Sequence, residues 1–246
     1  MAQLVFLYDT TRVKTPPCSR RAAGMGPGSS RPLHLSPQPP DFHGSTFLKQ
    51  ELYELTPDPD LLKAPATDAN FKTATAPLFD YLDALHPNLW RAGRAFPKNS
   101  SALRRLLTDN ETDIAFSFNP AAASNAIANG ELPDTVRTYV LDGGTIGNTH
   151  FLAIPFNASA AAGAMVVANF LMSPEAQARK QDPDIWGDLT VFAVDKLRGP
   201  DKARFDALDL GIATLSPEEL GKTLPEPHQS WMTRLERAWS ARYGIE

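Results

Sequence analysis

Short apolar runs alternate with amphipathic stretches along this chain of 246 residues. Residues Leu4 to Tyr8 form a continuous apolar run, which predicts a strand buried on both faces. The runs at 113–118 and 136–141 are rich in aliphatic and aromatic residues and are followed by turn-forming residues, so they predict strands as well. The runs at 150–155 and 190–194 predict two further short strands.

Helical periodicity fills the intervals between these runs. Ser45 or Thr46 is the expected N-cap of a first helix that Pro57 ends, and Trp231, Leu235 and Trp239 recur at helical spacing in the last one. Other helices are expected at 77–86, 100–107 and 158–172, after Ser173, and after Ser216. Apolar residues surround most of the helix at 158–172, so we expect it to be buried. Strands alternating with helices indicate an α/β fold with a largely parallel sheet.

The segment 16–40 interrupts this alternation. It contains seven prolines and three glycines in 25 residues, together with several arginines and serines. Such a composition is typical of a disordered segment or a linker.

Charge and composition narrow the possible partners. Lys and Arg number 24 against 28 Asp and Glu, a net charge of −4, which argues against nucleic acid as a partner. The longest apolar stretch is shorter than the roughly 18 residues of a membrane span, and the first ten residues do not have the pattern of a signal peptide. The single cysteine, Cys18, cannot form an internal disulfide.

The local motifs of enzymes and metal sites are not found in the sequence. Gly221-Lys222-Thr223 resembles the end of a phosphate-binding loop, but Ser216 stands where that loop needs its first glycine. The glycines at 24–28 are interrupted by Pro27 and do not follow a predicted strand. No nucleophile elbow occurs, and we expect neither a metal nor a cofactor. The five histidines are too far apart in sequence for a local ligand pair: His34, His43, His86, His150 and His228.

Small polar residues gather where predicted strands end or helices begin. They lie at 44–46, 117–120 and 143–149. In open α/β sheets the strand ends are where ligands bind, and a helix N-terminus can bind an anion through its backbone N–H groups. The alternative interpretation is that these residues form turns and caps that satisfy only the backbone.

One long segment makes the sequence recognisable. Residues 149–188 read THFLAIPFNASAAAGAMVVANFLMSPEAQARKQDPDIWGD, and within them FLMSPEAQ follows a predicted strand, a turn and a helix. This segment resembles the bacterial ABC-transporter solute-binding proteins. Residues 1–14 and 40–246 are similar to a branch of that family related to thiamine, polyamine and iron carriers.

The resemblance implies a two-lobed α/β fold of the periplasmic-binding-protein type. Such a protein holds a small solute in the cleft between its lobes and delivers it to the ABC permease subunits, with no chemistry of its own. We expect residues 1–148 to form mainly the second lobe, and residues 149–246 to cross back and supply the remainder of the first lobe and the C-terminal helices. The expected protein is a periplasmic monomer that does not span the membrane.

The resemblance also selects candidate ligand-binding residues. Ser45, Thr46, Asn119 and Asn148 match positions where loops of the family face the cleft, and Thr149 lies on the strand that crosses back. The indole rings of Trp90 and Trp186 are further candidates, because an aromatic face can stack on a ring or a cationic ligand. Packing in the core is the other interpretation for both tryptophans.

Two departures from the family pattern lead to a hypothesis about the chain itself. The family begins with a signal peptide and the first half of one lobe, whereas this sequence starts near the crossing strand. Segment 16–40 stands where the family has a helix and a strand. We therefore expect a truncated or frameshifted protein with most of one lobe missing, which would be cytoplasmic if expressed as given. Two alternatives stay open, an enzyme such as a transferase or isomerase on a similar scaffold, and a non-functional fragment.

Overall fold

The computed structural model describes residues 1–19 and 39–244, and the predicted disorder of 16–40 lies mostly outside these ranges. Its central sheet has the strand order β3-β2-β4, with β2 at Val5–Asp9, β3 at Ile114–Ser117 and β4 at Val136–Tyr139. All three strands were predicted, and most residues of β2 are buried as expected. The expectation of a largely parallel sheet is wrong, because β2 pairs antiparallel with both neighbours.

A second small sheet lies beside the first. It consists of β1 (Ala2–Gln3), β5 (Thr145–Asn148) and β6 (Thr223–Leu224), in the order β1-β5-β6. Strand β5 pairs antiparallel with β1 and parallel with β6, so this sheet joins segments from both ends and the middle of the chain. The buried side chain of Gln3 donates hydrogen bonds to Thr145 Oγ1 and to the carbonyl of Leu220, both at 3.0 Å.

The helix starts differ from the predictions at two places. Helix α1 spans Phe42–Leu55 and is capped by Asp41, whose carboxylate accepts from the His43 N–H, so the predicted cap at Ser45 or Thr46 is wrong. Helix α2 spans Asp68–Leu85 with Pro77 inside it, because Thr67 and Asn70 form a capping box two turns earlier.

The remaining helices follow the sequence signals more closely. Ser173 caps α6, and Ser216 forms a capping box with Glu219 at the start of α8, as predicted. The structure has α3 at Ser100–Thr108, α4 at Ala122–Ala128, α5 at Ala161–Leu171, α6 at Pro174–Gln181, α7 at Gly199–Asp206, α8 at Pro217–Leu220 and α9 at Ser230–Tyr243. Short 3₁₀ turns occur at Pro59–Lys63, His86–Asn88, Trp90–Gly93 and Val194–Lys196.

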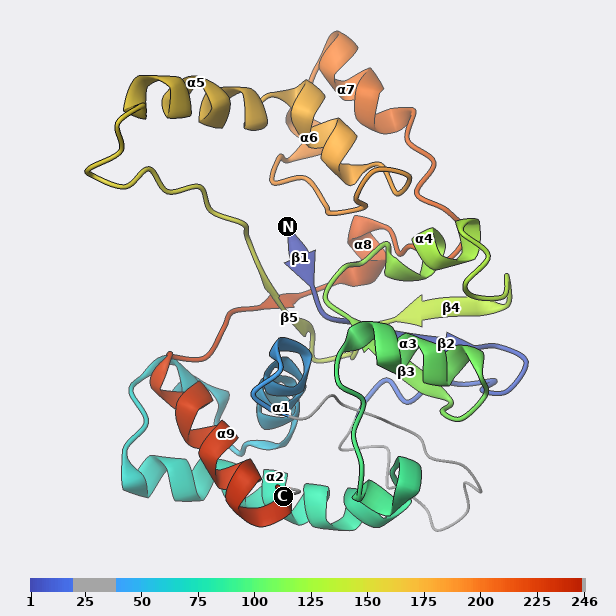
Figure 1. Ribbon diagram of the computed structural model, residues 1–246, viewed down its shortest axis with the longest axis vertical. Helices are drawn as coiled ribbons and strands as arrows, with labels where there is room; N and C mark the ends of the chain where they lie inside the picture. The colour runs from blue at the N-terminus through green and yellow to red at the C-terminus, as the bar shows by residue number, and fades with distance from the viewer. Residues whose placement is uncertain (20–38, 245–246) are drawn as a thin grey trace.

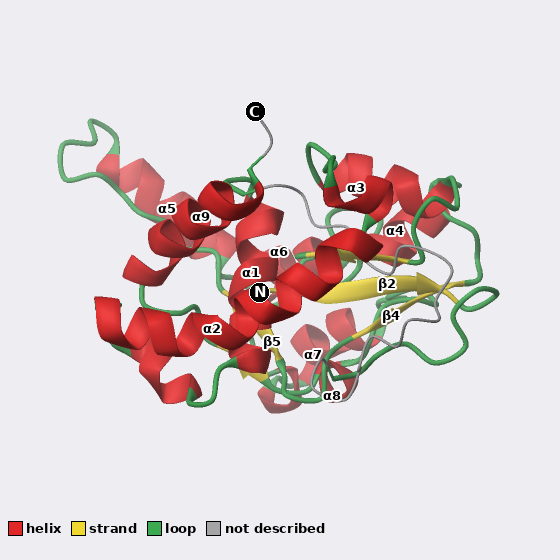
Figure 2. Ribbon diagram, turned by 90° about the horizontal axis from the view of Figure 1, so that it is seen from below, coloured by secondary structure: helices red, strands yellow, loops and turns green. Residues whose placement is uncertain are grey.

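Helices α1, α2 and α9 gather in one part of the molecule, while α5, α6 and α7 lie at the opposite end, with the sheets between them (Figure 1; Figure 2). Trp231, Leu235 and Trp239 of α9 are buried, which confirms the predicted apolar face of this helix. Trp231 stacks on Phe71 of α2 at 5.8 Å between ring centroids. None of the described helices combines the length and apolar character needed to span a bilayer.

The predictions for residues 150–194 contain three errors. Residues 150–155 and 190–194 are not strands, since no strand among the described residues pairs with either run. Helix α5 forms where a helix was expected, but none of its residues is buried. Among the described helices α5 packs mainly against α6, so apolar periodicity alone predicted its burial wrongly.

Candidate functional site

A cavity of about 580 Å³ is lined by residues from six separate segments of the chain. The N-terminus of α1, the end of β3, the residues after β5 and the loop after α6 all contribute to its wall. Four predicted ligand-binding residues, Asn119, Asn148, Thr149 and Trp186, border this one cavity. Its other lining residues include Phe42, His43, Phe118, His150, Phe151 and Asp188.

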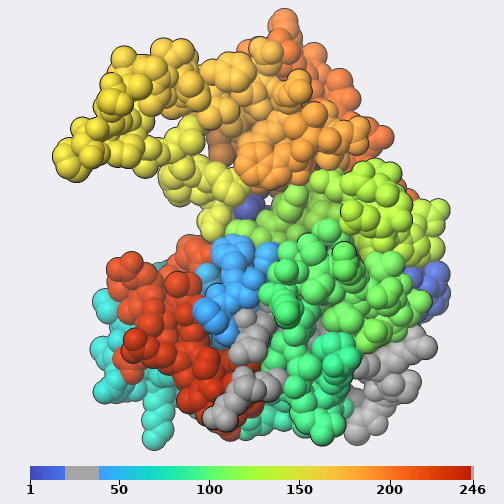
Figure 3. Space-filling model, in the orientation of Figure 1, coloured from blue at the N-terminus to red at the C-terminus, as the bar shows by residue number. Residues whose placement is uncertain are grey.

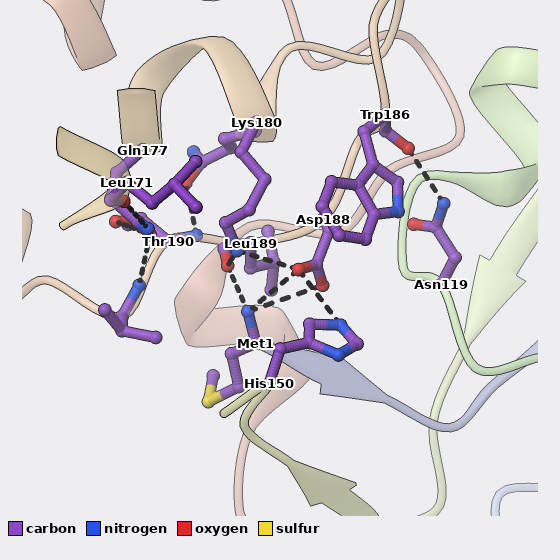
Figure 4. Close-up of polar contacts among 12 residues, drawn as sticks. Met1, Asn119, His150, Leu171, Gln177, Lys180, Trp186, Asp188, Leu189 and Thr190 are labelled. Atoms are coloured by element: carbon purple, nitrogen blue, oxygen red, sulfur yellow. Dashed lines mark hydrogen bonds and ion pairs between the residues drawn. The ribbon is translucent and has the colours of Figure 1, made fainter. Parts of the chain in front are cut away.

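Asn119 fixes one wall of the cavity. Its Oδ1 accepts a hydrogen bond from the Ala121 N–H, and its Nδ2 donates to the Trp186 carbonyl, both at 3.0 Å (Figure 4). Gly187 has a positive φ of 75°, and a Cβ there would lie 2.5 Å from the Cβ of Ala121. The loop after α6 can therefore approach the end of β3 only because residue 187 is glycine.

Asp188 is the centre of a charged cluster at the edge of the cavity (Figure 4). Its carboxylate is almost fully buried and lies 2.7 Å from Lys180 Nζ and 3.2 Å from His150 Nε2. It also accepts from the amino group of Met1, at 3.4 Å. Burial lowers the pKa of that amino group to about 6, so Lys180 is the main balancing cation near neutral pH.

Several aromatic side chains line the cavity. Trp186 and Phe42 are half exposed, and the Phe42 ring packs edge-on against Phe118 at 5.1 Å between centroids. The His150 ring lies 5.5 Å from that of Trp186. Aromatic rings together with polar side chains are suited to a small ligand that stacks and forms a few hydrogen bonds.

The buried imidazole of His43 makes the stability of the fold depend on pH. Burial lowers the pKa of its imidazole below the usual 6.5, and the nearby Asp41 opposes this only in part. The unfolded chain therefore binds a proton on this side chain before the folded chain does, so stability is lost as the pH falls below 6.5. We expect His43→Gln to lose less stability than the parent protein between about pH 7.5 and about pH 5.5, measured by urea unfolding. Equal losses in both proteins would contradict this.

Three predicted residues lie outside the cavity. Ser45 is buried on α1 and donates to Glu236 Oε1 at 2.5 Å, and Thr46 is buried beside it. The Trp90 indole N–H donates to Glu111, and the Arg91 guanidinium lies 4.2 Å above its ring. Ser45 and Thr46 do not border this cavity, because α1 begins at least four residues earlier than predicted and both residues lie within the helix and not at its N-terminus.

The prediction missed several lining residues that the structure brings into the cavity. Asp188 and Phe151 belong to the recognisable segment 149–188 but do not stand at a predicted strand end. Phe42 and His43 lie a few residues before Ser45 and Thr46, the predicted helix caps. A search for polar and aromatic residues on both sides of each predicted cap would have found Phe42 and His43. Among the described residues, no cluster of three His, Cys, Asp or Glu side chains could hold a metal ion.

Both the sequence and the structure of this chain are similar to known proteins. The chain is 43% identical over 247 residues to Protein YnjB of Escherichia coli K12, an alignment that spans 99% of this chain and 61% of that protein. No family model matches. The structure is similar to that of AfuA, a periplasmic binding protein of Actinobacillus pleuropneumoniae with exogenous fructose-6-phosphate bound, with a TM-score of 0.57 and 18% identity. The fold is that of the periplasmic binding proteins.

A second structural neighbour agrees with the first. A solute-binding protein of Streptococcus pneumoniae in complex with the blood group A-trisaccharide matches with a TM-score of 0.58 and 12% identity. This chain covers 67% of AfuA and 64% of the pneumococcal protein. About a third or more of each compared protein thus has no counterpart in this chain.

Proposed function

We propose that this protein binds a small, uncharged polar solute with a flat ring face in the cavity bordered by Asn119, Asn148, Thr149 and Trp186. The observation that supports this is the cavity itself, an open site of about 580 Å³ with aromatic and polar walls. Similar structures hold fructose-6-phosphate and a trisaccharide, so solutes of this size fit proteins with this fold.

The charges around the cavity favour an uncharged solute. Asp188 is the only carboxylate among the described lining residues, and Lys180 already pairs with it at 2.7 Å. A charged ligand gains most from an opposite charge that has no partner, and the described lining residues offer none. Binding should accordingly depend little on salt concentration.

The proposed binding mode assigns the cavity walls to two lobes. We propose that residues 1–148 form mainly the second lobe and that residues from Thr149 onward cross back to the first, with Asn148 and Thr149 at the crossing. A solute that touches both walls would favour the closed arrangement, because it has more contacts there. In this role the protein works in the periplasm as a monomer and hands its solute to an ABC permease.

Trp186 provides the sharpest test of this proposal. We expect at least one member of a panel of neutral sugars and uncharged heterocycles to raise the melting temperature, and Trp186→Ala to weaken its binding about tenfold in calorimetry. Trp90→Ala is the matched control, because Trp90 is partly exposed and lies outside the cavity, and it should leave the affinity unchanged. The proposal fails if no panel member binds, or if both tryptophan variants bind equally well.

An enzyme on this scaffold is the second candidate function. The observation that favours it is the contact of 3.2 Å between His150 Nε2 and Asp188 at the cavity edge, since a histidine oriented by a carboxylate can move protons. The test is to recover the solute after prolonged incubation and examine it by mass spectrometry and NMR. An unchanged solute supports binding alone, whereas conversion that Asp188→Asn abolishes would establish an enzyme.

A further inference from the structure

The segment around α4 holds two loops that come from a distant part of the chain. Residues 119–125 contact residues 186–187 in the loop after α6 and residues 211–214 in the loop after α7. These contacts are termed the α4 latch. In the space-filling view the orange segment that contains both loops lies against the yellow-green segment that contains α4 (Figure 3). The latch therefore joins parts of the chain that precede and follow Thr149, where the proposed lobes divide.

Two glycines allow both loops to approach α4 closely. Gly187 and Gly211 have positive φ angles of 75° and 78°. A Cβ on Gly187 would lie 2.5 Å from the Cβ of Ala121, and a Cβ on Gly211 would lie 2.6 Å from the Cβ of Ser124. Both distances are shorter than those of real Cβ contacts. Any other residue at either position would therefore hold its loop away from α4.

The Ser124 hydroxyl holds the loop after α7. It lies 2.8 Å from Thr214 Oγ1 and accepts a hydrogen bond from the Ala213 N–H at 3.2 Å. Ser124 and Ala213 are nearly fully buried, so water hardly competes for this bond. The loop itself is turned by Asp209, whose carboxylate accepts from the Gly211 N–H at 2.9 Å. Directional bonds as well as close packing thus fix this loop to α4.

The carbonyl of Trp186 holds the loop after α6. The side-chain amides of Asn119 and Asn125 both donate to this carbonyl, at 3.0 Å and 3.4 Å. The backbone is thus fixed, while the indole ring stays half exposed at the cavity wall. All of these bonds join groups of the chain itself, so none of them depends on a solute. The wall that carries Trp186 therefore has its place before a solute binds.

We propose, on the basis of the lobes and the solute site proposed above, that the α4 latch keeps the two cavity walls together before a solute binds. Ser124, Gly187 and Gly211 are then positioning residues, since none of them is among the described lining residues and each acts through the loop it holds. A solute that meets a preformed site binds more tightly, by the factor by which the binding-competent fraction is raised. Only small residues meet at the two glycine contacts, so the latch can release without exposing a large apolar surface.

Distances between two spin labels test the latch without any solute. The labels are attached at Asn129→Cys, on the exposed end of α4, and at Arg179→Cys, on the exposed surface of α6, in a Cys18→Ser background. Double electron–electron resonance should give one narrow distance distribution for the parent protein. We expect a longer and broader distribution after Gly187→Ala or Gly211→Ala, because the added methyl group pushes the loop away from α4.

A third glycine provides the matched control. Gly199 also has a positive φ, of 52°, but a Cβ there would meet no neighbouring group within 4 Å. Gly199→Ala therefore strains the backbone without pushing on α4, and the narrow distribution should remain. Adding Ala121→Gly to Gly187→Ala removes the opposing methyl group and should restore the narrow distribution. A broad distribution in the parent, or equal distributions in G187A, G211A and G199A, would overturn the proposal.

Solute affinity is a readout that packing alone would not change. Gly211 lies outside the cavity, so Gly211→Ala should weaken the binding of a panel member at least about threefold, whereas Gly199→Ala should leave it unchanged. Circular dichroism shows that each variant is folded. If the label distances change as expected but no panel member binds, the latch stands and the proposed solute class fails. Unchanged affinity in G211A despite a longer label distance would overturn the proposal, because the contact would then not prepare the site.

Discussion

Replacing Asp188 with asparagine is expected to lower the free energy of unfolding by about 2–4 kcal/mol. The carboxylate is almost fully buried, and Lys180, with only 15% of its side chain exposed, lies 2.7 Å from it. Removing the negative charge leaves the ammonium group of Lys180 in a largely dry environment without a counter-ion, which costs more than the pair itself contributes. The retained hydrogen bond from Lys180 to the Leu189 carbonyl places the expected value below that of a completely isolated charge.

Urea unfolding of the variant at neutral pH measures this effect. Asp206→Asn is the control, because Asp206 pairs with Lys202 on the exposed surface of α7, where such a pair contributes less than about 1 kcal/mol. Adding Lys180→Met to Asp188→Asn should recover part of the loss, since the unpaired charge is then gone. If D188N and D206N destabilise the protein equally, Asp188 does not have the structural role inferred here.

Local signals in the sequence predicted the helices well where caps are explicit. Ser173 and Ser216 cap α6 and α8 as expected, because a serine hydroxyl and the following N–H groups lie within one turn of each other. The start of α1 was misplaced because Asp41 and Ser45 are both acceptable caps, and the choice depends on packing that periodicity does not describe.

Strands were harder to predict because a strand exists only when another strand pairs with it. The apolar runs at Leu4–Tyr8 and 150–155 look alike in sequence, yet only the first lies between two partners. The same reason explains the error in direction, since no local feature distinguishes a parallel from an antiparallel neighbour. Burial of α5 depends in the same way on what covers it.

The candidate site was predicted in part. Asn119 lies two residues after β3, a strand that the sequence pattern predicted, whereas Asn148 is the last residue of β5, a strand that was not predicted. The family resemblance had selected both residues. Asp188 and His150 meet across 38 positions of sequence, and their contact depends on how the loop after α6 folds back, which Gly187 makes possible. Contacts of this kind follow from the tertiary fold and not from any local motif.

Replacing Trp231 with alanine should destabilise the protein by about 3–5 kcal/mol, the largest effect expected of a single substitution here. The indole is completely buried between α9 and α2, stacks on Phe71, and donates from Nε1 to the Ala64 carbonyl at 2.9 Å. Its removal leaves a cavity where three segments meet and a buried carbonyl without its donor.

Trp231→Phe separates the contribution of the hydrogen bond from that of the ring, and Trp186→Ala provides a comparison at a half-exposed position. Trp231→Phe keeps an aromatic ring but loses the hydrogen bond to Ala64, so we expect a loss of about 1–2 kcal/mol, between the parent and Trp231→Ala. Trp186→Ala removes the same side chain from a half-exposed position and should cost less than about 1 kcal/mol. Urea unfolding of the three variants tests this order. A loss in W186A as large as that in W231A would mean that the loop after α6 packs as tightly as the interface of α9 with α2, and the cavity wall would then be too rigid to close on a solute.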